Sequence, residues 1–79
     1  MNKEIDLKEI ADFYGMEDYS MIEVLKPYVN VVNNISESEE NTKELYWIIL
    51  CYINAKVQPP KEDKNYEKFL TIKEAIDRN

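Results

Sequence analysis

The fold depends most on the stretch Leu45-Tyr-Trp-Ile-Ile-Leu-Cys-Tyr-Ile53, in which nine apolar residues follow one another. The chain contains one Gly and three Pro among its 79 residues, and so few helix breakers favour long helices over several short strands. Nine apolar residues in a row cover every side of a helix. This helix is therefore either central and wrapped by the others, or leaves one side exposed for a partner.

The apolar run extends in both directions into a helix over residues 37–56. Ser36 and Glu39 before it have the spacing of a capping box, and Pro59 and Pro60 after it end the helix. A further helix is predicted over residues 63–78. Its inner stripe is Tyr66, Phe69, Leu70, Lys73 and Ile76, with Lys73 as the polar exception.

The N-terminal half predicts two more helices. The first, residues 7–14, carries Leu7, Ile10, Ala11 and Tyr14 on one stripe, and Gly15 after it suits a left-handed stop. The second begins near Glu17 or Ser20 and reaches Ile35, with Pro27 either kinking or splitting it. The inner positions of this second helix are Met21, Val24, Leu25, Tyr28, Val32 and Ile35.

Capping signals at the expected helix starts support these four helices. Capping-box spacing occurs at Asp6 with Glu9 and at Ser20 with Glu23, as well as at Ser36. We therefore expect an all-α protein: one domain over residues 1–79, a compact bundle of four helices, or five if Pro27 splits the second.

The net charge of −6 is unevenly distributed. Residues 1–40 hold ten acidic and three basic side chains, whereas residues 41–79 hold six and seven. A field of this sign repels phosphate backbones and anionic lipid headgroups. It favours a protein partner with a basic surface and makes direct nucleic-acid or membrane binding an unfavoured interpretation.

The composition argues against catalysis, cofactors and metals. The chain has no His, one Cys and one Gly, which leaves no His-activated nucleophile, no zinc ligand set and no Gly-rich phosphate loop. Cys51 lies inside the apolar run, where we expect it to behave as a small buried hydrophobe. The apolar run is far below the ~20 residues that span a bilayer, so we expect a soluble, cytoplasmic, non-enzymatic protein.

Residues 7–25 resemble a helix-turn-helix unit. Ala11 stands where that family has a small residue in the first helix, and Gly15, four residues later, stands at the turn. The remaining packing positions are occupied by Ile10, Tyr14, Met16, Met21 and Val24. The resemblance implies an N-terminal helix-turn-helix pair. The chain departs from DNA-binding members at Glu17, Asp18, Tyr19, Ser20 and Glu23, where those members carry basic and amide side chains.

These patterns together predict a regulator or inhibitor that presents an acidic, Tyr-bearing helical surface to a basic site on a partner protein. A sharper version is a DNA mimic of the phage or mobile-element type. The candidate partner-binding residues are Asp12, Glu17, Asp18, Tyr19 and Glu23, with Tyr46 and Trp47 as a second patch. The other tyrosines with an expected role, in the core or at its boundary, are Tyr14, Tyr28, Tyr52 and Tyr66.

Two other classes of function stay open. A DNA-binding transcriptional regulator would have to use lysines outside the acidic helix, namely Lys26, Lys43, Lys61, Lys64 and Lys68. A self-assembling helical module would bury one side of residues 45–53 across a two-fold axis as a homodimer.

Overall fold

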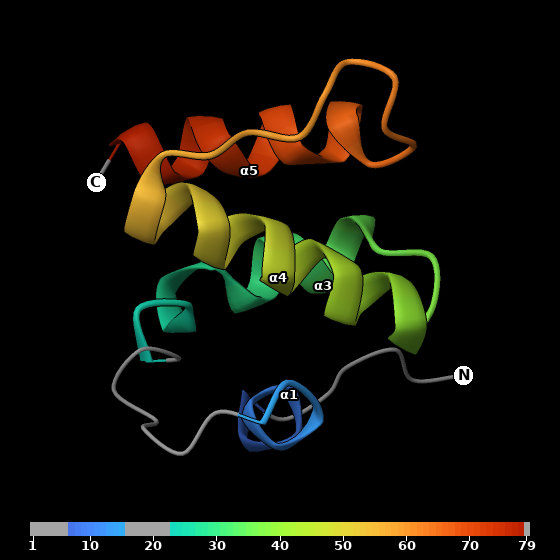
Figure 1. The fold of residues 1–79 in the computed structure, drawn as a ribbon, viewed down its shortest axis with the longest axis vertical. Helices are drawn as coiled ribbons and strands as arrows, with labels where there is room; N and C mark the ends of the chain where they lie inside the picture. Colours follow the sequence, from blue (N-terminus) through green and yellow to red (C-terminus); the bar gives the residue numbers. More distant parts are fainter. Residues whose placement is uncertain (1–6, 16–22, 79) are drawn as a thin grey trace.

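A computed structural model describes residues 7–15 and 23–78 of the chain. The regular structure of these residues is helical throughout, which confirms the all-α prediction. Four α-helices and one short 3₁₀ helix are present in this part: α1 (Leu7–Phe13), η1 (Lys26–Tyr28), α3 (Val29–Ile35), α4 (Glu39–Ala55) and α5 (Tyr66–Arg78). Figure 1 shows α5 lying along α4, with α3 behind α4 and α1 below them, seen nearly end-on.

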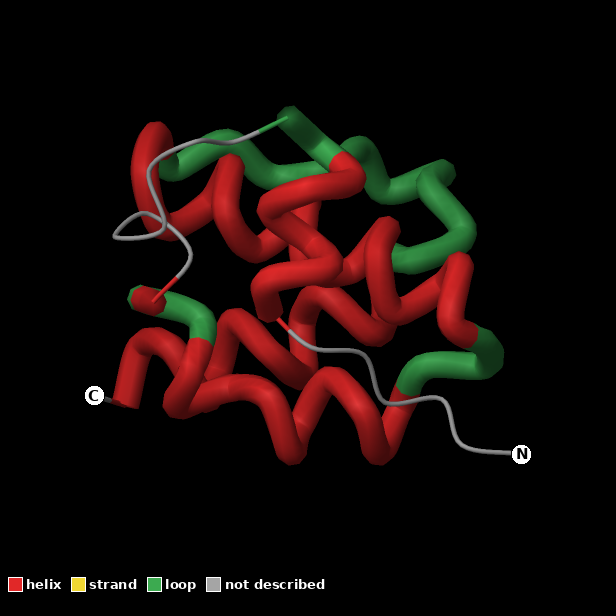
Figure 2. The backbone as a smooth tube through the Cα atoms, turned by 90° about the horizontal axis from the view of Figure 1, so that it is seen from below, coloured by secondary structure: helices red, strands yellow, loops and turns green. Residues whose placement is uncertain are grey.

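Helix α1 lies across the other helices (Figure 2). It contributes two fully buried side chains, Ile10 and Ala11. It ends as predicted. Gly15 has a φ of 70°, and its N–H donates to the carbonyl of Asp12 at 3.3 Å. A left-handed residue at this point is least strained when it lacks a Cβ, so Gly15 gives the chain its exit from the helix.

Pro27 splits the second predicted helix. The residues around it form the 3₁₀ turn η1, in which the Tyr28 N–H donates to the Leu25 carbonyl at 2.9 Å, and α3 begins only at Val29. Because the backbone before Pro27 is turned rather than α-helical, the 3.6-residue stripe does not apply there. Leu25 is fully buried, but the inward position predicted for Val24 is wrong, since Val24 is 40% exposed.

The cap of α4 is Ser38 and not Ser36. The Ser38 Oγ accepts from the Asn41 N–H at 3.1 Å, and the Asn41 Oδ1 accepts from the Glu37 N–H at 3.0 Å. Ser36 instead directly follows the last residue of α3 as its C-terminal cap, where its N–H donates to the Val32 carbonyl at 2.9 Å. The capping box predicted at Ser36 is therefore displaced by two residues, because the preceding helix already uses that serine. The boxes predicted at Asp6 and Ser20 begin outside the described residues.

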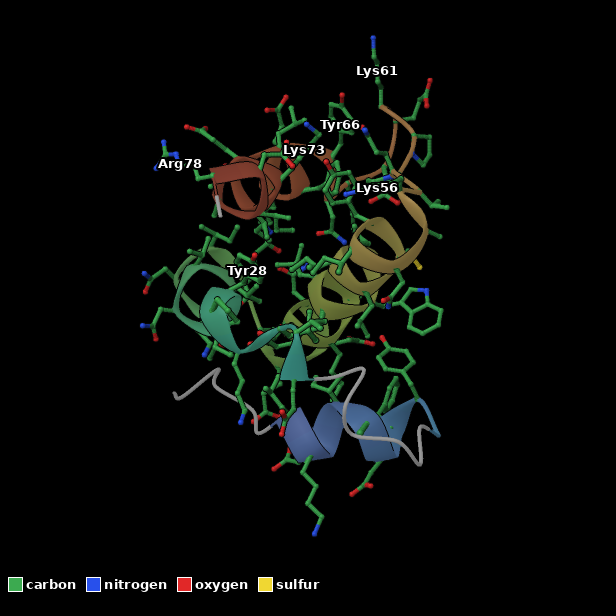
Figure 3. The ribbon with its side chains drawn as sticks, turned by 90° about the vertical axis from the view of Figure 1, so that its left-hand side faces the viewer. Tyr28, Lys56, Lys61, Tyr66, Lys73 and Arg78 are labelled. Carbon is green, nitrogen blue, oxygen red and sulfur yellow. The ribbon has the colours of Figure 1, made fainter. Side chains whose placement is uncertain are left out.

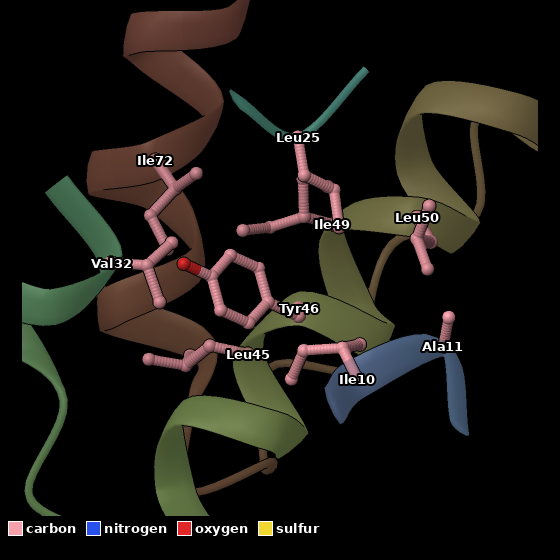
Figure 4. Packing of buried hydrophobic residues seen from close by; sticks show 9 residues of the cluster. All are labelled: Ile10, Ala11, Leu25, Val32, Leu45, Tyr46, Ile49, Leu50 and Ile72. Carbon is pink, nitrogen blue, oxygen red and sulfur yellow. The ribbon is translucent and has the colours of Figure 1, made fainter. Parts of the chain in front are cut away.

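All four α-helices contribute to one apolar cluster (Figure 4). Its buried members are Ile10, Ala11, Leu25, Val32, Leu45, Tyr46, Ile49, Leu50 and Ile72. Tyr46 lies in the middle, with its hydroxyl directed toward Val32 and Ile72 (Figure 4). The adjacent Trp47 is 44% exposed. The nine-residue apolar run is thus mostly wrapped by the other helices, but the side of α4 that carries Trp47 stays open.

Helix α5 packs on α4 through Phe69 and Ile72, which are fully buried. Phe69 meets the ring of Tyr52 edge-on, with ring centroids 5.4 Å apart. The inner position predicted for Leu70 is wrong, since Leu70 is 37% exposed. The buried stripe of α5 runs from Phe69 to Ile72, three residues later, and Leu70 lies beside this stripe.

No helix of the described segments is long and apolar enough to cross a membrane. The four tyrosines expected in the core or at its boundary are confirmed there, with Tyr28 and Tyr52 buried and Tyr14 and Tyr66 half-buried. Cys51 is half-buried, so its thiol is less enclosed than the sequence predicts.

Lys56 adopts a left-handed conformation, with a φ of 56°, directly after α4. Its N–H donates to the Tyr52 carbonyl at 2.8 Å, and the next N–H, of Val57, donates to the Cys51 carbonyl at 3.3 Å. A residue with a Cβ is strained here, and we expect Lys56→Gly to raise the free energy of unfolding by about 1 kcal/mol. Urea denaturation measures the change. Lys56→Ala is the control, because it keeps the Cβ and should give no stabilisation.

Candidate functional site

The acidic surface predicted from the sequence lies only partly within the described residues. Glu17, Asp18 and Tyr19 fall outside them. Asp12 is exposed on α1. Glu23 is exposed too, and its carboxylate lies 3.7 Å from the Lys26 ammonium. An exposed pair of this kind contributes little stability, so Glu23 can exchange its partner at small cost.

Tyr46 and Trp47 do not form a shared patch. Tyr46 is fully buried, whereas Trp47 is 44% exposed. Successive residues of an α-helix point about 100° apart, so Tyr46 can face the core while its neighbour Trp47 faces solvent. The prediction that Tyr46 contacts a partner is therefore wrong, and its ring belongs to the core.

Trp47 instead lies with two aromatic residues at the end of α1. Its ring stacks on Tyr14, with centroids 4.8 Å apart and planes 27° from parallel. Phe13 meets Tyr14 edge-on, also at 4.8 Å, and is 60% exposed. Such arrangements are favourable pair geometries for aromatic rings. We call Phe13, Tyr14 and Trp47 the aromatic surface.

Tyr14 attaches this surface to α4. Its hydroxyl donates to the Lys43 carbonyl at 3.0 Å. Partial burial raises the pKa of the Tyr14 hydroxyl above its ordinary value, and the nearby Glu44 carboxylate raises it further. Tyr14 is therefore held as a neutral hydrogen-bond donor, and the end of α1 stays in contact with the open side of α4.

Carboxylates border the aromatic surface on its α4 side. Phe13, Tyr14 and Lys43 line a hollow of 360 Å³ together with Glu39, Glu40 and Glu44. The Lys43 ammonium lies over the Phe13 ring, 4.5 Å from its centroid. The electron-rich face of an aromatic ring attracts a cation at this distance. The three carboxylates in the hollow also favour a positive charge there.

A buried polar network supports the acidic side of the site. Asn41 is its centre: its amide nitrogen donates to Glu44 at 3.0 Å and to Asn65 at 2.9 Å. Its Oδ1 accepts from the Lys68 ammonium at 3.1 Å, besides the Glu37 N–H. These contacts use both donors and both acceptor positions of one amide side chain, so Asn41 ties α4 to the start of α5.

The neighbouring carboxylates are stabilised in their charged form. The hydrogen bond from Asn41 is the largest of the effects that lower the pKa of Glu44, and Lys64 lies 3.3 Å from that carboxylate. Lys68, 2.9 Å from Glu37, lowers the pKa of Glu37 in the same way. The acidic character of this side therefore persists well below neutral pH.

The other end of the aromatic surface is apolar. A second hollow, of 230 Å³, lies between the open side of α4 and the segment that leads to α5. It is lined by Trp47, Ile48, Cys51, Val57, Gln58, Pro59, Pro60 and Asp63. Val57 is 56% exposed there. Because Pro59 and Pro60 have no N–H group, their side of the hollow presents mainly carbon atoms to a bound side chain.

Three of the five lysines that a DNA-binding face would need are engaged within the chain. Lys26 pairs with Glu23, Lys64 with Glu44 and Lys68 with Glu37. Lys43 lies over Phe13. Figure 3 shows Lys56, Lys61, Lys73 and Arg78 around α5 and the segment before it, on the side away from α1.

Comparison with known proteins adds no family to this description. A scan against protein-family models found no match, and searches of curated proteins and of solved structures found none either.

Sequence reasoning found Trp47 but missed Phe13 and the acidic border of Glu39, Glu40 and Glu44. One signal was available. Glu40, Glu44, Trp47 and Cys51 follow one another at spacings of four, three and four, which places them on one stripe of α4. Nothing in the sequence shows that the end of α1 lies against this stripe, because that contact joins residues about thirty positions apart.

The lowered carboxyl pKa values predict a loss of stability in acid. The carboxyl pKa values of Glu37 and Glu44 lie below the ordinary glutamate value of 4.5. The pKa of Asp77, whose carboxylate lies 2.8 Å from the Lys73 ammonium, is below the ordinary aspartate value of 3.8. Their stabilising contribution is fully present above about pH 5 and is lost as the pH falls through the lowered values. Urea midpoints from pH 7 to pH 3 measure this slope. It should become shallower in Lys68→Met and stay unchanged in the exposed control Lys61→Met.

Proposed function

We propose that this chain acts by binding another protein, and that the aromatic surface with its acidic border is the binding face. The observation that carries the proposal is the exposure of Phe13 and Trp47 on either side of Tyr14 in one continuous surface. Exposed large aromatic side chains that cluster are a property of interfaces more than of ordinary surfaces. Tyrosine and tryptophan are also among the residues that contribute most to binding energy.

Charge selects the class of partner. Glu39, Glu40 and Glu44 border the aromatic surface, and the chain as a whole carries a net charge of −6. This field attracts a basic protein surface and slows the approach of nucleic acid. A regulator or inhibitor of a basic protein fits this chemistry. DNA mimicry, in which carboxylates replace phosphates, stays a narrower form of the same proposal.

The helix-turn-helix alternative has less support. Its first helix and turn are compatible with the buried Ala11 and left-handed Gly15. The lysines it would need are largely engaged: Lys64 and Lys68 already pair with carboxylates of α4 and the segment before it. Freeing them for phosphate contacts would break ion pairs that the network around Asn41 holds in place.

Photo-cross-linking tests the proposal. A benzoylphenylalanine placed at position 13 lies on the aromatic surface, and the same residue at position 70 on α5 is the matched control, because Leu70 is also exposed but far from this surface. In a nuclease-treated cell extract, we expect position 13 to cross-link a protein through a Lys- or Arg-rich segment. Trp47→Ala should remove that product.

Other outcomes contradict the proposal. Cross-links that form equally from both positions would indicate non-specific contact. Cross-links to a second copy of the chain would assign the surface to self-assembly, and sedimentation would then show a dimer that Trp47→Ala dissolves. Retention of a DNA duplex at low salt by the wild type would favour the helix-turn-helix interpretation.

A further inference from the structure

We infer that the binding face accepts one polypeptide segment in a single direction, with basic side chains at Glu39 and Glu40 and one large apolar side chain in the hollow beside Trp47 and Val57. This inference rests on the proposed protein-binding function. It adds the chemistry of the partner: a segment that is basic at one end and apolar at the other.

The acidic end has unsatisfied charge. Among the described residues no ammonium or guanidinium lies within ion-pair distance of Glu39 or Glu40, whereas Glu44 already has Lys64. The same hollow contains the Phe13 ring, whose face already holds the Lys43 ammonium at 4.5 Å. A partner lysine or arginine entering here therefore meets the two carboxylates of Glu39 and Glu40, and it reaches the face of the Phe13 ring only by displacing Lys43.

The apolar end offers a different environment. Its lining is mostly carbon, and its one carboxylate, Asp63, accepts the Asn65 N–H at 2.8 Å as part of a turn. Its volume of 230 Å³ is large enough for a leucine, methionine or phenylalanine side chain. A charged side chain placed here would lose water against a mostly apolar lining that holds a single carboxylate, so this end favours the apolar part of the segment over the basic part.

The spacing between the ends limits the segment. Glu40 and Cys51 lie eleven positions apart on one stripe of α4. At 1.5 Å per residue this is about 16 Å. A helical segment spans that distance with about eleven residues, and an extended one with about five. Trp47 lies between the two ends, so a segment that contacts both must pass over its ring.

A second copy of this chain fits the face less well than a basic segment does. In a two-fold dimer the same face meets itself, which would bring acidic ends against acidic or apolar ends. With a net charge of −6 the two copies also repel one another. Charge complementarity therefore selects the basic and apolar segment as the occupant.

A library of random twelve-residue peptides, displayed and selected on the full chain, tests the inference. We expect the selected peptides to place Lys or Arg at one end and a large apolar residue at the other. Synthetic copies without tryptophan are then titrated while the fluorescence of Trp47, the only tryptophan, is followed. We expect Glu39→Gln with Glu40→Gln, and separately Val57→Asp, each to weaken binding about tenfold. Glu74→Gln and Leu70→Asp, on α5, are the matched controls and should leave binding unchanged.

Paired changes separate the two ends. A peptide whose Lys and Arg are replaced by Gln should lose its sensitivity to Glu39→Gln and Glu40→Gln but keep its sensitivity to Val57→Asp. Peptides that respond to the carboxylate changes and ignore Val57→Asp would overturn the inference while leaving the proposed function intact. If no peptide quenches or shifts Trp47 fluorescence and position 13 gives no protein cross-link, the proposed function itself fails.

Discussion

Replacing Asn41 by alanine is expected to lower the free energy of unfolding by about 3 kcal/mol, because it leaves several buried polar groups without partners. Asn41 is 5% exposed and bonds Asn65, Glu44, Lys68 and the Glu37 backbone. A chain of 79 residues has a total stability of roughly 4–12 kcal/mol. The loss would therefore remove about a quarter or more of the total stability. Urea and thermal denaturation followed by circular dichroism measure it.

Two variants show whether the network is responsible. Asn34→Ala, an exposed position on α3, should change the stability by less than about 0.5 kcal/mol. Asn41→Asp keeps the acceptor but removes both donors and adds a carboxylate beside Glu44. It should therefore be nearly as destabilising at pH 7 and recover partly in acid. An Asn41→Ala protein as stable as the wild type would show that the network contributes nothing.

Replacing Phe69 by alanine is expected to cost about 4 kcal/mol, the usual range for a fully buried aromatic side chain. Phe69 is the main side chain by which α5 packs on α4, and its ring contacts those of Tyr52 and Tyr66, with centroids 5.4 and 6.5 Å away. Removing the ring leaves a cavity between α4 and α5 that the surrounding structure fills only in part. We expect α5 to separate from α4, with a lower thermal midpoint and faster amide exchange along residues 66–78.

The neighbouring residue is the control for this prediction. Leu70→Ala removes a side chain that is 37% exposed and should cost less than about 1 kcal/mol. Phe69→Leu, which retains most of the buried carbon, should lie between the two. Equal effects at positions 69 and 70 would contradict the packing of α5 described above.

Local features were predictable where the chemistry is local. Gly15 was predicted to end α1 because a left-handed residue is cheapest without a Cβ, and its φ of 70° confirms this. The absence of an N–H at Pro27 predicts a disturbed helix, and Pro27 lies within the 3₁₀ turn η1 that precedes α3. Each prediction needed only the residue and its close neighbours.

Predictions that needed the register of one helix against another were less successful. The sequence pattern predicts Ser36 as the cap of α4, but Ser36 caps the end of α3, and Ser38 caps α4 instead. The sequence predicts Tyr46 and Trp47 together at the surface, whereas Tyr46 is buried in the core and Trp47 is exposed. In a run where every residue is apolar, the pattern does not say which side is covered.

The sequence alone thus determined an all-helical chain, the places where its helices stop, and an acidic surplus in residues 1–40. The helices and their ends follow from backbone preferences, which depend on each residue and its close neighbours in the chain. The acidic surplus follows from the composition alone. Only the tertiary structure decided that the end of α1 lies on the open side of α4, so that Phe13 and Tyr14 join Trp47 beside Glu39 and Glu40. The physical reason is that residues far apart in the chain meet through the packing of whole helices, and a single sequence contains no direct record of that packing.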